Sequence, residues 1–379
     1  MKAIVLGGGF VGSIIAKDLA QDKDFQVSVV DQSERVLNKL ASEANIKGII
    51  GDLANADNIK KLVADQDIVL GAVPEVMGFN MLKAVVEAGK NIADVSAAPE
   101  NQLDLDDLAK KHNVTAVVEM GVAPGMSNLL VGYVDSLLDK TERVSILVGG
   151  LPVVREWPYE YMLVFSLRGV IGEYLTPARI VECGKLIEKP ALSDIELIDF
   201  PNIGTLEAFY TDGLGSLVYT VKAPFMKEKT LRYPGHAEKM RMLRETGFFG
   251  SEPIEVEGSK VKPLDLTIKL LFPKWERKNG ERDFTIMRIN VEGEKDNKRL
   301  RYTYDLLSYF DEKTNTTSMA RTTGLPCAIV GRLIAKGEYS RKGICPPEYV
   351  GQNHKIKQTI LNELEKRNIF YKESIAELK

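Results

Sequence analysis

Three glycines near the start of the chain have the spacing of a phosphate-binding turn. Gly7, Gly9 and Gly12 fit the pattern G-x-G-x-x-G and follow a short apolar run. In such a turn the first glycine makes the bend, the second lets backbone approach a pyrophosphate, and the third lets a helix pack against a strand. The helix N-terminus then offers free N–H groups to the phosphates. An ordinary glycine-rich turn is the alternative; the context favours a dinucleotide site that includes Phe10 and Val11.

An acidic residue at the end of the next apolar run indicates which dinucleotide is bound. Asp31 follows Gly12 by 19 positions, where a carboxylate accepts hydrogen bonds from the ribose hydroxyls of the adenosine. That carboxylate repels a 2′-phosphate, so we expect NAD rather than NADP. Arg35, one helical turn further on, would soften the repulsion. We assign Gln32 to the same site.

Residues that follow later strands are expected to complete the coenzyme site. Asp52 and Leu53 leave the third apolar run and are placed to meet the adenine; a helix N-cap is the alternative for Asp52. The fourth run ends at Ala72, Val73 and Pro74. In a parallel sheet these positions face the crevice at the carboxyl ends of the strands, where the nicotinamide half of the coenzyme lies.

Two carboxylates are candidates for the chemical step. A hydride-transfer enzyme must hold a substrate carbon against the nicotinamide and manage one proton. Asp94 and Ser96 end the fifth predicted strand, and Glu119 ends the sixth. Either carboxylate would accept a proton from an ammonium group or hold its charge, and Ser96 is assigned to the coenzyme. The alternative is that each acid caps or braces a loop.

A second group of polar residues lies much later in the chain. Thr230, Arg232 and His236 surround a Pro-Gly turn, and Tyr210 and Asp212 belong to another turn upstream. A guanidinium group suits a bidentate grip on an amino-acid carboxylate, and an imidazole is able to act as acid, base or hydrogen bonder. We therefore expect these five residues to bind substrate. Surface turns and a structural histidine are the alternatives.

The elements that must position these residues form two patterns. In the first part of the chain, short apolar runs alternate with helical periodicity, which predicts a Rossmann doubly wound parallel sheet. The predicted strands span 2–7, 25–30, 47–52, 68–72, 91–95 and 115–118. The predicted helices span 10–21, 33–44, 57–63, 78–87 and 103–111.

After about residue 143 the pattern becomes mixed and partly alternating, which predicts a second α+β domain on a mixed sheet. Residues 250–282 are rich in Pro, Lys and Glu and are expected to form an excursion at its edge, whereas 319–334 predicts a helix. We expect a dinucleotide-binding domain from 1–128 plus about 320–350, a substrate and oligomerisation domain from 129–319, and a helical tail from 351–379. The strands expected in the second sheet span 144–148, 181–187, 217–221, 264–271, 285–291 and 300–305.

Composition narrows the class of protein. Fifty basic and 53 acidic residues among 379 leave a net charge of −3, so nothing in the overall charge favours nucleic acid or an anionic membrane. The three cysteines and three histidines have no metal-ligand spacing, and we expect no metal. The start of the chain lacks a signal-peptide profile and no apolar run would span a bilayer, so a cytoplasmic protein is expected.

Seven segments in both parts of the chain carry a family resemblance, among them Gly-Val-Ala-Pro-Gly-Met-Ser-Asn at 121–128. Together they resemble the saccharopine dehydrogenase/reductase family, and within it the lysine 6-dehydrogenases. The resemblance implies NAD-dependent oxidative deamination at the ε-carbon of L-lysine, with release of ammonia and a 2-aminoadipate 6-semialdehyde that cyclises to piperideine-6-carboxylate. It also implies a homo-oligomer, dimer or tetramer. The other segments are 148–152, 173–179, 207–213, 230–236, 318–324 and 343–348.

The resemblance implies roles that agree with the chemistry of the residues. It assigns Arg232 to a substrate carboxylate and Glu119 to the substrate site. An amine substrate needs carboxylates near the reacting nitrogen and an arginine far from it. The amine must also lose a proton before the hydride leaves, so we expect activity to rise with pH. Two other hypotheses stay open: a saccharopine or carboxynorspermidine dehydrogenase/reductase of the same family, and a non-catalytic NAD-binding sensor.

Overall fold

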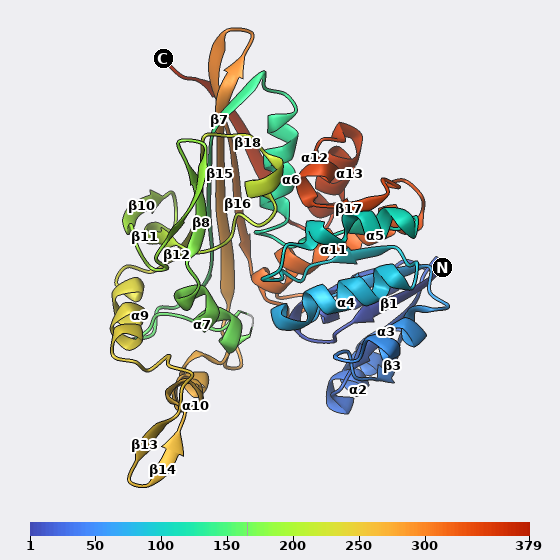
Figure 1. Cartoon of the computed structure of the whole chain (residues 1–379), viewed down its shortest axis with the longest axis horizontal. Coiled ribbons are helices and arrows are strands. Elements are labelled where there is room, and N and C mark those ends of the chain that lie inside the picture. Colours follow the sequence, from blue (N-terminus) through green and yellow to red (C-terminus); the bar gives the residue numbers. More distant parts are fainter. Residues whose placement is uncertain (165) are drawn as a thin grey trace.

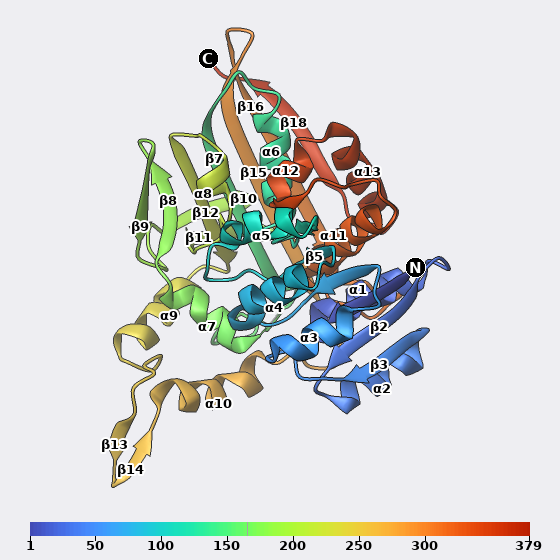
Figure 2. The same cartoon turned by 45° about the vertical axis from the view of Figure 1, so that its right-hand side comes forward.

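The computed structural model describes residues 1–164 and 166–379, which form two large sheets, a small two-stranded hairpin and the helices around them. Figures 1 and 2 show the first sheet and its helices beside a taller second sheet, with a hairpin arm that projects away below the second sheet. No helix among the described residues is long and apolar enough to cross a membrane.

The first sheet is parallel throughout and has seven strands in the order β17-β6-β5-β4-β1-β2-β3. The chain starts in the middle of the sheet, at β1, and β2 and β4 lie on either side of it. The order therefore reverses at β1, which creates the crevice where such sheets bind ligands. The strands are β1 (Lys2–Leu6), β2 (Gln26–Asp31), β3 (Ile46–Ile50), β4 (Ile68–Gly71), β5 (Ile92–Asp94), β6 (Thr115–Val117) and β17 (Gly343–Cys345).

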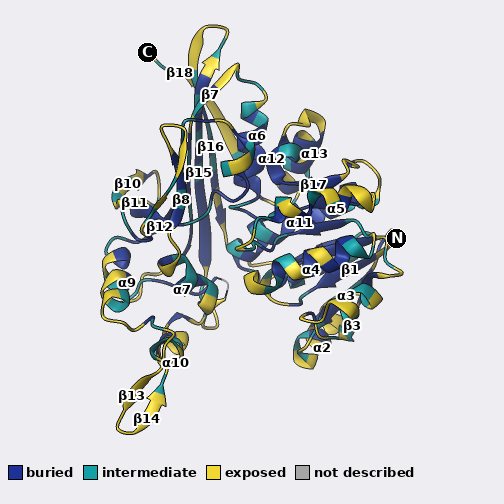
Figure 3. Cartoon of the chain, viewed as in Figure 1, coloured by how far each residue is buried: buried dark blue, intermediate teal, exposed yellow. Residues whose placement is uncertain are grey.

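Helices cover both faces of this sheet, as predicted. Apolar residues of α1, α2 and the late helix α11 pack on one face, and those of α3, α4 and α5 pack on the other. Figure 3 shows α2, α3, α4 and α5 with exposed residues on their outer sides, because their apolar residues recur with the helical period. In contrast, α11 has no exposed residue, since it packs against both sheets. Their bounds are α1 (Phe10–Ala20), α2 (Glu34–Glu43), α3 (Ala56–Val63), α4 (Glu75–Glu87), η1 (Gln102–Leu105), α5 (Asp106–Lys111) and α11 (Ser318–Ala335).

The second sheet has nine strands and is mixed, which confirms the predicted α+β architecture. Its main order is β10-β11-β12-β7-β15-β16-β18, with β8 paired to β12 and β9 paired to β8. Only the β12–β7 pair is parallel. The strands are β7 (Lys140–Pro152), β8 (Ala178–Glu182), β9 (Lys185–Lys189), β10 (Glu196–Phe200), β11 (Gly204–Tyr210), β12 (Phe225–Arg232), β15 (Asp283–Lys295), β16 (Lys298–Tyr309) and β18 (Tyr371–Glu377).

Several elements differ from the sequence-based expectation. The predicted strand at 217–221 is a short helix, α8 (Leu217–Thr220), and the one at 264–271 is the helix α10 (Pro263–Trp275). Both predictions were wrong because short apolar runs do not distinguish strand from helix. The predicted strand at 181–187 crosses a turn with Cys183 and Gly184 at positive φ, so it divides into β8 and β9. The tail contains α13 (His354–Glu365) but ends in strand β18 rather than helix.

The remaining elements are the hairpin arm and the helices that follow or precede the strands of the second sheet. A two-stranded hairpin of β13 (Ile254–Val256) and β14 (Ser259–Val261) precedes α10, and Figure 1 shows it extending away from both sheets. One apolar cluster includes α1, α6, α11 and α13 together with β7, β15 and β16, so a single core spans both sheets. The other helices are α6 (Met126–Asp135), α7 (Leu167–Leu175), α9 (His236–Glu245) and α12 (Pro347–Gly351).

Candidate functional site

The glycine turn has the geometry that its sequence predicts. Gly7 has φ of 101°, and a Cβ on it would lie 2.3 Å from the carbonyl oxygen of Ala72. A Cβ on Gly12 would lie 1.9 Å from the carbonyl oxygen of Gly7. Both positions therefore need glycine for close backbone packing. A Cβ on Gly9 would meet nothing within 4 Å, so the turn leaves open space where a pyrophosphate would approach.

Asp31 lies directly beside this turn. Its Oδ2 accepts a hydrogen bond from the backbone N–H of Gly8 at 2.8 Å, and its Oδ1 accepts one from Ser33 at 2.8 Å. The carboxylate is thus fixed at the carboxyl end of β2, where the ribose of an adenosine is expected. This arrangement fits a dinucleotide, which would be held by the turn and by Asp31.

The other predicted coenzyme residues lie around the same strand ends. Gln32 donates to Asp52 Oδ1 at 3.1 Å, and that oxygen also accepts from Ala54 N. Asp52 is not the N-cap of α3, since that role belongs to Asn55. Leu53 and Val73 are buried. Ala72 contacts the glycine turn, Pro74 is the N-cap residue of α4, and Phe10 and Val11 begin α1.

Asp94 is fully buried at the end of β5. Its Oδ1 accepts from Ser96 N at 2.9 Å, whereas Oδ2 has no hydrogen-bond partner among the described residues. Burial, with a smaller contribution from the nearby Glu119 carboxylate, raises the pKa of Asp94 to about 7. Ser96 is also buried and donates through Oγ to Val73 O. Asp94 and Ser96 therefore brace the strand ends beneath the crevice.

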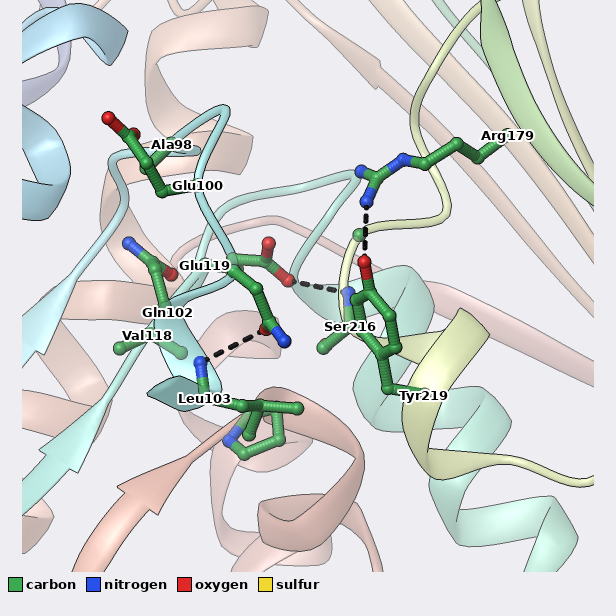
Figure 4. A pocket seen from close by; sticks show the side chains of 12 residues that line it. Ala98, Glu100, Gln102, Leu103, Val118, Glu119, Arg179, Ser216 and Tyr219 are labelled. Carbon is green, nitrogen blue, oxygen red and sulfur yellow. Dashed lines mark hydrogen bonds between the residues drawn. The ribbon is translucent and has the colours of Figure 1, made fainter. Parts of the chain in front are cut away.

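Glu119 lies in a pocket formed by both parts of the chain, shown in Figure 4. It has φ of 52°, and its Oε2 accepts from Ser216 N at 3.0 Å. Burial raises the pKa of Glu119, and the nearby Arg179 opposes that rise. The first sheet's loops contribute Glu100 and Gln102, and the second sheet's domain contributes Arg179, Ser216 and Tyr219.

Arg179 is a residue that sequence reasoning did not assign to the site. It follows α7 at the start of β8, and its Nε donates to both oxygens of Asp212 at 3.0 Å. Its Nη1 donates to the hydroxyl of Tyr219 at 3.2 Å (Figure 4). Asp212, predicted to bind substrate, is therefore the partner of this arginine. The sequence did contain one signal that could have identified Arg179, because it ends the family-like segment 173–179.

Three polar side chains share one face of β12 because side chains alternate along a strand. Glu228, Thr230 and Arg232 are buried on that face. Thr211 Oγ1 lies 2.8 Å from both Thr230 Oγ1 and Glu228 Oε2. Burial raises the pKa of Glu228 well above its ordinary value. The sequence analysis missed Glu228, since a lone acid within a strand carries no motif.

Arg232 is held at the end of this row. Its Nη1 donates to Leu231 O at 2.9 Å, its guanidinium lies 4.9 Å from the centre of the Tyr161 ring, and its Nη2 lies 3.4 Å from Oε2 of Glu173. Burial raises the pKa of Glu173 to about 7, although Arg232 opposes the rise. The Glu75 carboxylate at the start of α4 also raises it, so this group faces the first sheet's domain.

Two of the predicted substrate residues face away from the polar row. Tyr210 is paired with Lys229 in the sheet, and its ring lies 4.6 Å from Lys229 Nζ, on the opposite face of β12 from Arg232. His236 is buried, with Nε2 2.9 Å from the Tyr174 hydroxyl and Nδ1 3.2 Å from Tyr159 O. Burial lowers the pKa of His236 to about 3. His236 is therefore a neutral histidine packed in an aromatic cluster. This position agrees with the structural histidine given above as the alternative.

A parallel sheet that reverses its order beside a glycine turn, with an acid at the end of the next strand, is typical of a dinucleotide-binding domain. Comparison with models of known protein families leads to the same class of protein. The family model described as saccharopine dehydrogenase NADP binding domain matches residues 3–117, and that of the saccharopine dehydrogenase C-terminal domain matches residues 121–369. The chain therefore belongs to the saccharopine dehydrogenase family.

Individual relatives are distant but cover both domains. Saccharopine dehydrogenase [NADP(+), L-glutamate-forming] of Schizosaccharomyces pombe is 23% identical over 99% of each chain. Carboxyaminopropylagmatine dehydrogenase of Synechocystis is 22% identical, over 90% of this chain and 91% of its own. Apo saccharopine dehydrogenase (L-Glu forming) from Saccharomyces cerevisiae has the same fold, with a TM-score of 0.82 at 20% identity over 99% of each chain.

Proposed function

We propose that the protein oxidises a secondary amine that joins two amino-acid limbs, as in saccharopine, with NAD as the hydride acceptor. Oxidation at the carbon beside the nitrogen gives an imine, NADH and a proton. Addition of water to the imine then releases an aldehyde on one limb and a primary amine on the other. The names of the relatives support this reaction class.

The observation that carries the proposal is that two separate arginines, Arg179 and Arg232, belong to one continuous group of neighbouring charged side chains. Glu119 is a neighbour of the Arg179–Asp212 pair. Glu228 is a neighbour of Asp212 on one side and of the Arg232–Glu173 pair on the other. A substrate with a carboxylate on each limb would use one guanidinium for each. L-Lysine has one carboxylate and would leave one arginine unused.

Glu119 is the residue we assign to proton transfer. Ser216 N holds Oε2, so Oε1 is the oxygen that would accept a proton from the substrate nitrogen. The same carboxylate would stabilise the charge of an ammonium group before the proton leaves. Asp94 lies more deeply buried than the pocket. Because its pKa is raised to about 7, only part of this carboxylate is ionised near neutral pH.

ε-Deamination of L-lysine is the second candidate, and one observation favours it. Arg179 already has Asp212 and Tyr219 as partners, so this guanidinium does not need a substrate carboxylate to balance its charge. In that case Arg232 alone would hold the substrate, and the carboxylates near Glu119 would face the ε-ammonium group.

The deciding experiment is a substrate panel with the purified full chain. L-Saccharopine, L-lysine and carboxyaminopropylagmatine are each incubated with NAD or NADP while NADH or NADPH formation is followed. Turnover of saccharopine, with a rise in its KM in R179A, is expected. Turnover of lysine alone, with no KM change in R179A, would replace the proposal by the second candidate. Reduction of neither coenzyme with any amine would contradict both and leave the sensor hypothesis.

A further inference from the structure

The contact between Arg232 and Glu173 suggests a role for Glu173 that the reaction itself does not assign. Arg232 is only 4% exposed, yet its Nε has no hydrogen-bond partner among the described residues. The hydroxyl of Tyr161, whose ring lies under the guanidinium, also has none. A buried polar group without a partner costs free energy unless a ligand satisfies it. Donors at this place therefore point to an anionic ligand group.

Glu173 places an acceptor next to those donors. It lies on α7, whereas Arg232 ends β12, so the two side chains approach from different elements. The Glu173 side chain is 33% exposed, and its 3.4 Å contact with Arg232 Nη2 is longer than a good charge-assisted hydrogen bond. Arg232 does not saturate this carboxylate, and the Glu173 side chain is only partly buried.

We propose that Glu173 binds the α-ammonium group of an amino-acid substrate whose α-carboxylate is held by Arg232. The two charged groups of an α-amino acid are attached to one carbon, so they need a cation and an anion side by side, as Arg232 and Glu173 are. The Tyr161 hydroxyl would add a donor to the carboxylate. This inference rests on the proposed function only in taking an amino acid as the substrate.

The competing explanation is that Glu173 is a counter-ion that neutralises Arg232 and must leave before a carboxylate binds. The two roles predict opposite effects of E173Q. Loss of an ammonium partner weakens the binding of an amino acid, whereas loss of a blocking counter-ion strengthens the binding of any carboxylate.

Direct binding separates these roles without any turnover. L-Norleucine, which has an α-amino acid group and an apolar side chain, is titrated into the NAD-loaded protein by calorimetry. Hexanoate, which lacks the amino group, is the matched ligand. The matched variant is E188Q, which changes an exposed acid on β9 of the same domain. Fluorescence of the buried Trp275, whose ring lies 4.9 Å from that of Tyr161, gives a second reading in a W157F background.

We expect E173Q to weaken L-norleucine binding by about tenfold or more, as for a lost hydrogen bond to a charged group. Hexanoate binding should stay the same or become tighter, and E188Q should change neither. Tighter binding of both ligands to E173Q, equal loss of both, or no binding of L-norleucine by the unaltered protein would overturn the inference. The expected pattern without turnover of any amine would instead contradict the proposed function alone.

Discussion

At the scale of single residues, the proposed chemistry depends on Glu119. We expect E119Q to lower kcat by about 100-fold or more, the usual contribution of a general base, while NAD binding is unchanged. Glu100→Gln is the matched control, because Glu100 is an exposed acid that lines the same pocket. Because burial raises the pKa of Glu119, its ionised form accumulates only as pH rises. The kcat/KM for amine oxidation should therefore increase with pH, and equal rates for E119Q and the unaltered protein would exclude this role.

Asp31 is the residue that should determine coenzyme choice. We expect higher kcat/KM with NAD than with NADP, and D31A should lower the NAD value by about tenfold through loss of a charge-assisted hydrogen bond to ribose. Asp65→Ala is the control, since Asp65 is an exposed acid just after α3 in the same domain. Gly8 and Ser33 donate to the same Asp31 carboxylate, so thermal unfolding of both variants is measured alongside. A preference of the unaltered chain for NADP would show the prediction to be wrong.

At the scale of elements, two glycines of the same turn have different roles: Gly12 allows close backbone packing, and Gly9 leaves space for a ligand. Gly12→Ala should destabilise the coenzyme-free protein by about 2 kcal/mol, because its Cβ would overlap the Gly7 carbonyl. Gly9→Ala should leave unfolding unchanged, since Gly9 has φ of −64° and open space around it. It should instead weaken NAD binding. Urea unfolding and NAD titration of the two variants test this, and equal destabilisation by both would contradict it.

Elements also show where sequence patterns stop being informative. The first sheet was predicted strand by strand up to β6, because each strand is a buried apolar run followed by a helix of clear period. β17 was missed: three residues are too few for a pattern, and it joins β6 only after the chain has passed through the second sheet. α8 and α10 were assigned as strands because their apolar runs resemble buried strands until packing is known.

At the scale of the whole molecule, a buried acid connects the C-terminal segment to the site. Glu348 on α12 accepts from Ser216 Oγ at 3.0 Å and from Thr220 Oγ1, and Ser216 also holds Glu119. Burial raises the pKa of Glu348 from 4.5 to about 7. Its stabilising contribution is therefore full below about pH 4.5 and is lost as pH rises through 7.

The variant E348Q removes this titration while preserving the size of the side chain. We expect its free energy of unfolding, relative to the unaltered protein, to increase between pH 5 and pH 8 by on the order of 1–3 kcal/mol. Urea unfolding at the two pH values measures the difference, and Glu338→Gln, an exposed acid near the end of α11, is the control. A difference that does not change with pH would rule out a titrating Glu348.

The sequence alone determined the dinucleotide turn, the position of Asp31, the class of enzyme and the two-sheet architecture. The turn, Asp31 and the two sheets follow from spacing within one βαβ unit or from local periodicity, which any contiguous stretch of chain carries. The class of enzyme came from the resemblance of seven segments to a known family. The tertiary structure decided which polar residues meet. Arg179 with Asp212, and Arg232 with Glu173, come from elements that only the second sheet and α7 bring together.

The same distinction explains why two residues of the predicted site lie apart from Arg232. Tyr210 and His236 were grouped with Arg232 by sequence proximity. Strand alternation places Tyr210 on the opposite face, and the helix after Gly235 places His236 in an aromatic cluster. Which face a side chain occupies depends on the register between strands, and register is fixed by long-range pairing that the local sequence does not contain.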